Sequence, residues 1–286
     1  MTRVLVAGAT GQLGRRVLAE LRVRGYATRA LVRDERRASR LRGEADEAVV
    51  GDVTRPETLA RVCEGVNVVF SAVGAPLTLK RGGASFREVD FEGNKNLLNA
   101  AVSAGVGKFV YVSVFGAEQL GETEYVRAHE DFVSALKRSP LKHVVVRPTG
   151  FFSAMGEILR MARRGPVMSV GDGAARTNPI HEADLATVCA EAVAGERESI
   201  EVGGPEVFTR QQIAEMAFAS LGKRPKTFKV PAPLVRLMIA PLRLFDARLY
   251  ALMSFFVAVA QVDAVAPRSG SRRLADYFNE LARGDA

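Results

Sequence analysis

Residues 1–33 read MTRVLVAGATGQLGRRVLAELRVRGYATRALVR and carry the clearest pattern of this chain. Residues 2–7 form a short apolar run rich in valine, which is typical of a strand buried in a parallel sheet. After a glycine-rich turn, residues 15–24 have the apolar spacing of a helix that packs one face on such a sheet. Gly25 stands where helices commonly end, and residues 27–33 form a second apolar strand. The order strand, turn, helix, strand predicts a βαβ unit.

Glycine occupies three positions of the turn in a GxxGxxG spacing. Glycine allows a tight bend and lets the backbone approach a phosphate closely, and the start of a helix offers free N–H groups. Such a spacing is a weak signal alone, but between a strand and a helix it favours the pyrophosphate site of a dinucleotide. The alternative is a glycine-rich connection that binds no nucleotide. We expect cofactor contacts at Gly8, Thr10, Gly11, Gln12, Leu13 and Gly14.

The end of the second strand distinguishes the two nicotinamide cofactors. A carboxylate there accepts from the ribose 2′-hydroxyl of NAD, whereas an arginine pairs with the 2′-phosphate of NADP. This chain has Arg33 at that point, within an arginine-rich segment that also contains Arg37. Arginine binds phosphate through two parallel hydrogen bonds, so the segment favours NADP(H). NAD(H) stays open because Asp34 could serve the ribose, and a solvated helix face is the alternative reading of the arginines.

The bulk composition limits the classes of function. The chain of 286 residues is long enough for one large domain or two modest ones, and its net charge is +8. The sequence has no tryptophan and no nucleic-acid module, and much of the charge lies in the arginine-rich segment, so we expect no nucleic-acid partner. Cys63 and Cys189 form no disulfide framework or metal-binding cluster, so we expect two buried thiols and no metal. No secretory leader precedes the first strand, which predicts a cytoplasmic protein.

Further strands are expected at residues 48–53, 66–70, 109–114 and 143–146, alternating with helices at 86–104 and 125–138 and a loop at 75–83. This alternation predicts an α/β fold with a doubly wound, Rossmann-type parallel sheet and a ligand at the carboxyl edge of the strands.

The ends of these strands offer additional cofactor contacts. Asp52 could accept from the adenine amino group while Val53 packs on the ring, but the same residues also suit a helix start before Pro56. Small residues that follow the fourth strand could pass under the second ribose. The contacts expected here are Asp52, Val53, Ala72, Val73, Gly74 and Pro148.

The pattern after Gly150 is looser. We expect a β-hairpin or loop at residues 165–178, placed over the site, and a helix capped by Thr209 at residues 210–221. Residues 231–262 are apolar but interrupted by charges, so they do not span a membrane. They form either two helices that cover a substrate pocket or a helix pair that contacts a membrane surface or a protein. The remaining elements are expected at residues 153–164, 182–194, 199–202 and 272–281.

Eight motifs in order resemble the atypical short-chain dehydrogenase/reductases, and within them the NmrA-like NAD(P)-binding proteins. The resemblance implies a Rossmann domain at residues 1–150 and a smaller, interleaved substrate domain over most of 151–286, with about 178–204 returning to the sheet. The motifs are GATGQLG (8–14), ALVRD (30–34), GDVTRPETL (51–59), VDFEGNKNLLNAA (89–101), KFVYVS (108–113), VVVRPTGFF (144–152), NPIHEADLA (178–186) and EVGGPE (201–206).

The resemblance also implies catalytic residues. Active members use a serine, a tyrosine and a lysine, the last two spaced YxxxK, and here Ser113 and Tyr125 match while His129 replaces the lysine. Tyr125 and His129 share a helix face, but histidine is mostly neutral at pH 7 and would activate a phenol of pKa ~10 poorly. Three interpretations stay open: a weaker acid/base pair, a proton from substrate or water, or cofactor binding without turnover.

These patterns lead to two hypotheses of function. The first is an NADP(H)-dependent oxidoreductase that transfers hydride to a small hydrophobic carbonyl, enone or quinone-like substrate, with Phe151, Phe152 and Met155 lining an apolar pocket. The second is an NADP(H)-binding sensor or assembly protein with little turnover that uses residues 231–262 for a partner. A monomer or a homodimer is expected in either case.

Overall fold

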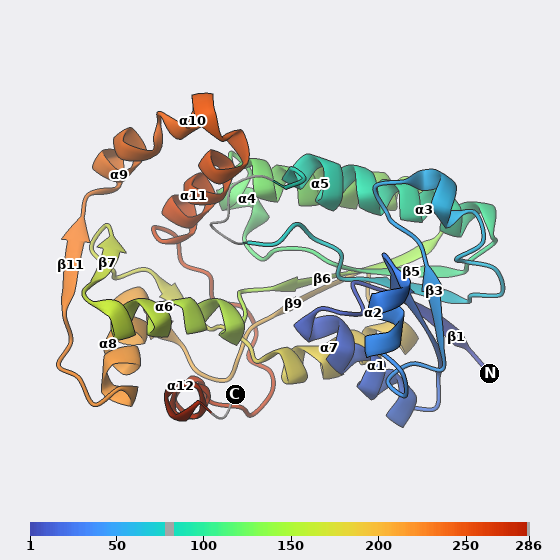
Figure 1. Cartoon of the computed structure of the whole chain (residues 1–286), viewed down its shortest axis with the longest axis horizontal. Coiled ribbons are helices and arrows are strands. Elements are labelled where there is room, and N and C mark those ends of the chain that lie inside the picture. Colours follow the sequence, from blue (N-terminus) through green and yellow to red (C-terminus); the bar gives the residue numbers. More distant parts are fainter. Residues whose placement is uncertain (78–82, 285–286) are drawn as a thin grey trace.

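Seven parallel strands form the central sheet of this computed structural model, which describes residues 1–77 and 83–284 (Figure 1). Their order across the sheet is β3-β2-β1-β4-β5-β6-β9, and every neighbouring pair is parallel. This order confirms the predicted doubly wound α/β sheet, in which the ligand site lies at the carboxyl ends of the strands. The strands are β1 (Arg3–Ala7), β2 (Ala27–Val32), β3 (Glu47–Val50), β4 (Val68–Ser71), β5 (Lys108–Val112), β6 (Lys142–Pro148) and β9 (Ser199–Val202).

Helices cover both faces of the sheet, which explains why its strands are apolar throughout (Figure 1). One face carries α1 (Gln12–Val23) and α7 (Glu182–Ala194), which pack on each other. The opposite face carries α3 (Asn94–Ser103) and α5 (Glu124–Lys137). The short helix α2 (Glu35–Arg40) connects β2 to β3.

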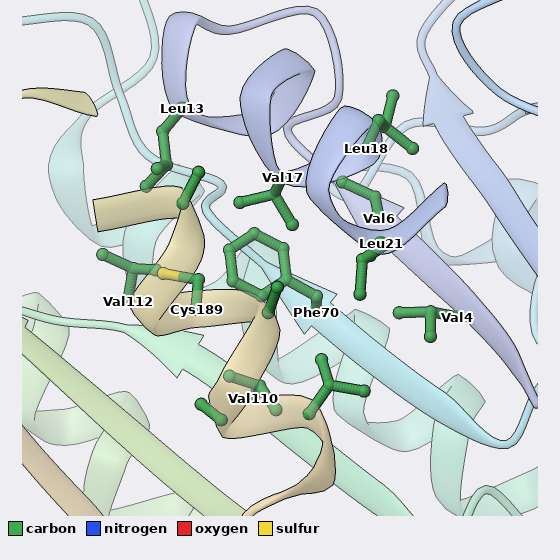
Figure 2. Close-up of a cluster of buried hydrophobic side chains, with 14 of the residues drawn as sticks. Val4, Val6, Leu13, Val17, Leu18, Leu21, Phe70, Val110, Val112 and Cys189 are labelled. Carbon is green, nitrogen blue, oxygen red and sulfur yellow. The ribbon is translucent and has the colours of Figure 1, made fainter. Parts of the chain in front are cut away.

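The apolar stripe of α1 fills the core beneath the glycine-rich turn. Figure 2 shows the ring of Phe70 from β4 among Val17, Leu21 and Cys189, all of them buried. Each such side chain contributes roughly 1.5–3 kcal/mol when it is fully buried, so this packing holds the start of α1 against the sheet. Cys63 and Cys189 are free, buried thiols, as predicted.

The expected helix at residues 86–104 is divided into two forms. A π-helical segment, η2 (Arg87–Gly93), precedes α3, and its wider turn directs the buried Asp90 toward the end of β4. A short 3₁₀ turn, η1 (Pro56–Leu59), follows β3. The loop predicted at residues 75–83 includes 78–82, which lie outside the described residues.

A second core joins α6 (Phe152–Arg164), α8 (Arg210–Ser220) and α12 (Leu274–Arg283). Thr209 caps α8 through a capping box with Gln212, which confirms the predicted start of this helix. The division into domains at 1–150 and 151–286 stays a prediction, although β9 pairs with β6 in the main sheet.

The β-hairpin offered as one reading of residues 165–178 is wrong. β7 (Val167–Val170) pairs in parallel with the distant β11 (Thr227–Val230), and β8 (Arg176–Thr177) pairs with β10 (Phe208–Thr209). Backbone groups of the segment therefore find partners far along the chain, which local turn signals do not reveal.

Residues 231–262 form three helices where two were expected. They are α9 (Ala232–Ile239), the single turn α10 (Leu242–Phe245) and α11 (Ala247–Val259), of which α11 packs on α5 and the short α4 (Ala117–Leu120). Pro241 separates α9 from α10. No helix in the described part of the chain has the length and apolar character needed to cross a membrane.

Candidate active site and cofactor cradle

The glycine-rich turn packs so closely on its neighbours that two of its positions require glycine. Gly8 has a positive φ of 82°, and a Cβ placed there would lie 2.7 Å from the carbonyl oxygen of Ala72 at the end of β4. A Cβ on Gly14 would lie 2.2 Å from the carbonyl oxygen of Gly8. Real Cβ atoms do not come so near to backbone, so larger residues would force the turn away from the sheet.

The start of α1 is open to an anion. Gly11 is the N-cap residue, and no side chain caps the helix, so its first N–H groups have no side-chain acceptor. Thr10 and Gln12 are exposed beside this end, whereas the side chain of Leu13 is buried in the core and leaves only its backbone facing the turn. Uncapped N–H groups at the positive end of a 12-residue helix fit the pyrophosphate of a dinucleotide.

At the end of β2, Asp34 and Arg33 differ in whether their side chains already have partners. The Asp34 carboxylate caps α2 by accepting from the Arg37 backbone N–H at 2.8 Å, and it also pairs with the Arg37 side chain. The hydrogen bond from that N–H and the Arg37 charge hold the pKa of Asp34 below its usual value. Arg33 is exposed, and within residues 1–77 and 83–284 it makes no hydrogen bond or ion pair. Arg33 is thus the more available of the two predicted phosphate ligands.

Asp52 closes a turn before η1. Its carboxylate accepts from the Thr54 backbone N–H at 2.9 Å and the Thr54 hydroxyl at 2.8 Å, so it supports a turn and does not cap a helix directly. Val53 is buried against Gly93, where an added Cβ would lie 2.9 Å from the Val53 side chain. The predicted adenine contacts of both residues stay predictions.

The segment after β4 is fixed by two buried polar side chains that the sequence analysis missed. Asn94 donates to the carbonyl oxygen of Val73 at 3.2 Å, and Asp90 accepts from the Ala75 N–H at 3.0 Å. Both side chains are fully buried. The two bonds hold the backbone at the predicted contacts Ala72, Val73 and Gly74. A signal was present, because both polar residues interrupt a helical segment inside the quoted VDFEGN motif.

His129 takes part in the same buried network. Its Nδ1 atom lies 2.5 Å from the hydroxyl of Tyr111 on β5, and its Nε2 atom lies 3.1 Å from Oδ1 of Asp90. The face shared with Tyr125 is confirmed, since the two rings meet edge to face at 4.7 Å. The Nδ1 atom is thus engaged by Tyr111, whereas Nε2 forms no hydrogen bond with a described residue, and the acid/base pair of Tyr125 and His129 stays a prediction. His129 links β5 to η2.

Tyr125 lies in an apolar cage to which two other parts of the chain contribute aromatic rings. Its ring is 5.2 Å from Phe86 before η2 and 4.6 Å from Phe255 of α11, measured between ring centroids. Burial, followed by the negative charge of Asp90, raises the pKa of the Tyr125 phenol above its usual value. The phenol therefore keeps its proton at neutral pH.

Ser113 at the end of β5 is tied to an ion pair. Its hydroxyl donates to Glu130 at 3.1 Å, and Arg147 of β6 binds the same carboxylate through two hydrogen bonds of 2.6 and 2.9 Å. Although burial acts in the opposite direction, Glu130 raises the pKa of Arg147. Sequence reasoning missed Glu130 and Arg147, although VVVRP contains the arginine. A substrate oxygen would have to compete with Glu130 for the Ser113 proton.

The three residues predicted to line a substrate pocket have different environments. Phe152 is 1% exposed and packs against His181 and Tyr277 in the second core, and its role in a substrate pocket stays a prediction. Met155 contacts the same core, and Phe151 packs beside the sheet near Ile180. Pro148 is buried, and its carbonyl oxygen accepts from Phe115, which leaves its predicted cofactor contact untested.

Comparison with known proteins identifies the family. The sequence profile described as NAD(P)H-binding matches residues 8–196. The chain belongs to this NAD(P)H-binding family. The match confirms NAD(P)H binding and the resemblance to the atypical short-chain dehydrogenase/reductases, and the contacts expected at the turn stay predictions. The preference for NADP over NAD stays a prediction.

Two curated relatives span most of this chain. The chloroplast divinyl chlorophyllide a 8-vinyl-reductase of Cucumis sativus is 31% identical over 252 residues, which are 80% of this chain and 59% of that protein. This chain therefore spans about three-fifths of that relative's length. The photosystem II assembly factor Ycf39 of Synechocystis sp. is 27% identical over 248 residues, which are 85% of this chain and 75% of the factor.

A solved structure shows the same fold. The NADPH-dependent quinone oxidoreductase of Escherichia coli, in complex with NADPH, aligns with a TM-score of 0.77 at 19% identity. The alignment covers 97% of this chain and 99% of that one, so the shared architecture includes the C-terminal part.

Proposed function

We propose that this protein is an NADPH-dependent reductase of an apolar carbonyl, enone or quinone-like compound. The observation that carries the proposal is the setting of Tyr125, a protonated phenol on α5 walled by Phe86 and Phe255. These aromatic neighbours would suit a flat, apolar substrate that approaches the phenol with an oxygen. The names of two similar proteins, a vinyl reductase and a quinone oxidoreductase, support the same class of substrate.

The preference for NADPH rests on Arg33. Its side chain is exposed at the end of β2, whereas Asp34 is occupied by Arg37. A 2′-phosphate would find a free guanidinium there, and a 2′-hydroxyl would find an acceptor already in use. Bound NADPH would supply the hydride for the reduction.

The residues of this chain would supply the proton and the orientation. Tyr125 would give its phenolic proton to the substrate oxygen, because a raised pKa keeps that proton in place until charge develops on the oxygen. Its ionised form is unfavourable in the cage, so reprotonation from water completes the cycle. Ser113 would orient the oxygen when its hydroxyl leaves Glu130. Tyr111, His129 and Asp90 would hold α5 and the end of β4 in register.

The test is NADPH oxidation at 340 nm over a panel of quinones, enones and apolar ketones, with Tyr125→Phe as the variant. We expect turnover on at least one quinone or enone, a loss of about 10²–10⁴-fold in kcat for Tyr125→Phe, and unchanged NADPH binding by fluorescence. Equal kcat values in the wild type and the variant would show that Tyr125 is not the proton donor.

A second function is favoured by one observation. The position of the family's lysine holds His129, whose Nδ1 atom lies against the Tyr111 hydroxyl and is therefore not directed at Tyr125. An NADP(H)-binding assembly or sensor protein with little turnover would be compatible with this site, and one relative is named an assembly factor. Tight NADPH binding without oxidation over the whole panel would favour this second function.

A further inference from the structure

Helices α9 and α10 form an apolar tip that projects from the body of the protein, at the top of Figure 1. The tip consists of Leu234, Leu237, Met238, Leu244 and Phe245, all exposed. Leu244 and Phe245 are the most open, at 84% and 83% exposure. Single exposed apolar residues are ordinary, but several large ones within 12 residues, over two adjoining helices, indicate a surface that contacts something apolar.

The helices that carry the apolar tip are packed against the rest of the protein. The opposite face of α9 is buried, with Val235 and Ile239 packed on Val257 of α11. Asp246, directly after the tip, caps α11 by accepting from the Leu249 N–H at 2.9 Å. The protein thus holds the tip in place from below while its outer side chains face solvent.

The segment of the chain that carries the tip is rich in positive charge. Residues 223–245 contain lysine or arginine at six positions and no acidic residue, and the next acid, Asp246, is used as a helix cap. Arg236 and Arg243 are exposed beside the apolar side chains. A second copy of this chain would bring like charges together, so a symmetric contact of two tips is disfavoured.

We propose that the apolar tip docks on a bilayer that contains anionic lipids. Such a surface offers acyl chains for Leu244 and Phe245 and phosphate groups for Arg236 and Arg243, which is the composition of interfacial amphipathic helices. The tip would lie on the bilayer without crossing it, since α9 and α10 have 8 and 4 residues. Lipid binding needs no turnover, so it is independent of the reductase activity.

One consequence of docking does rest on the proposed function. α11 continues from the tip to Phe255 in the wall of the Tyr125 cage. A docked tip would therefore hold the cage close to the bilayer, where apolar quinones or enones concentrate. The substrate would belong to the lipid-dissolved members of its class.

The test is cosedimentation of the full-length protein with vesicles of phosphatidylcholine alone or mixed with phosphatidylglycerol. We expect binding to the mixed vesicles, weakened about tenfold or more by Phe245→Glu, because a phenylalanine that would insert among the acyl chains is replaced by a charge that the lipid repels. Arg243→Gln should weaken binding about fivefold at low salt. Val23→Glu is the matched control, since Val23 is 86% exposed at the end of α1 and the change in charge is the same.

Three outcomes would overturn lipid docking. They are no binding to mixed vesicles, equal losses in Phe245→Glu and Val23→Glu, or a dimer that Phe245→Glu abolishes in the absence of vesicle binding. Unchanged NADPH affinity and circular dichroism check that the variants fold. NADPH oxidation of a water-soluble quinone without vesicles reports on the reductase proposal separately.

Discussion

The Nε2 atom of His129 lies 3.1 Å from Oδ1 of Asp90, and both side chains are buried beneath the end of β4. Asp90 uses its second oxygen to hold the Ala75 N–H, and His129 uses its second nitrogen to contact Tyr111. A buried polar chain thus links β5, α5 and η2 to the strand end that faces the predicted cofactor. The Nε2 and Oδ1 atoms are close but form no hydrogen bond, so the hydrogen bonds of this chain are those with Tyr111 and the Ala75 N–H.

Loss of His129 is expected to destabilise the protein. His129→Ala leaves the Tyr111 hydroxyl without its partner and removes the ring beside the buried Asp90 carboxyl, which should cost roughly 2–4 kcal/mol in the free energy of unfolding. Urea denaturation followed by circular dichroism measures the change. His143→Ala is the control, because His143 is half-buried on β6 and its ring makes no hydrogen bond with a described residue, whereas Nδ1 of His129 contacts the Tyr111 hydroxyl. Equal losses of unfolding free energy in the two variants would show that the network does not stabilise the fold.

Turnover is expected to be insensitive to pH over the physiological range. Burial and Asp90 raise the pKa of Tyr125, so its folded-state phenol stays protonated at pH 7 and through ~pH 9, beyond which even a free phenol, with pKa ~10, begins to ionise. A proton donor should then give a flat profile of kcat from pH 7 to ~pH 9. The measurement is the rate of NADPH oxidation at saturating substrate. A decline with a midpoint near pH 8 would point to a different donor.

Arg33 is expected to determine the choice of cofactor. Arg33→Ala should weaken NADPH binding about tenfold, or roughly 1.4 kcal/mol, because a charge-assisted pair with the 2′-phosphate is lost. NADH affinity should stay unchanged, and Arg36→Ala, on the same exposed segment, should affect neither cofactor. Fluorescence titration measures all four affinities. The interpretation fails if NADH binding falls as much as NADPH binding.

Gly14 is expected to tolerate no side chain. In Gly14→Ala the new Cβ would lie 2.2 Å from the Gly8 carbonyl oxygen, so the turn must move away from α1. We expect a loss of about 1–3 kcal/mol in stability together with loss of NADPH binding. Gly107→Ala is the control, since its nearest contact is at 3.6 Å. Calorimetry and fluorescence titration report the two effects, and wild-type NADPH affinity in Gly14→Ala would argue against a cofactor site at this turn.

Sequence reasoning was most successful where the physical cause is local. The valine-rich strands, the helix from Gln12 to Val23 and the capping box at Thr209 depend on side chains within a few residues of each other. The glycines of the turn likewise signal a backbone that comes close to its neighbours. Together with the ordered motifs, these local features were enough to predict the Rossmann sheet and NAD(P) binding.

The sequence by itself therefore determined the order of strands and helices and the glycine turn that opens α1. Only the tertiary structure decided that His129 contacts Asp90 and Tyr111, that β7 pairs with β11, and that Phe152 lies in a core. The reason is physical: partners of a buried polar group, or of a strand edge, are selected by position in space among residues far apart in the chain. The periodicity of a sequence predicts which side of a helix or strand is buried, but it does not predict which residues pack against that side.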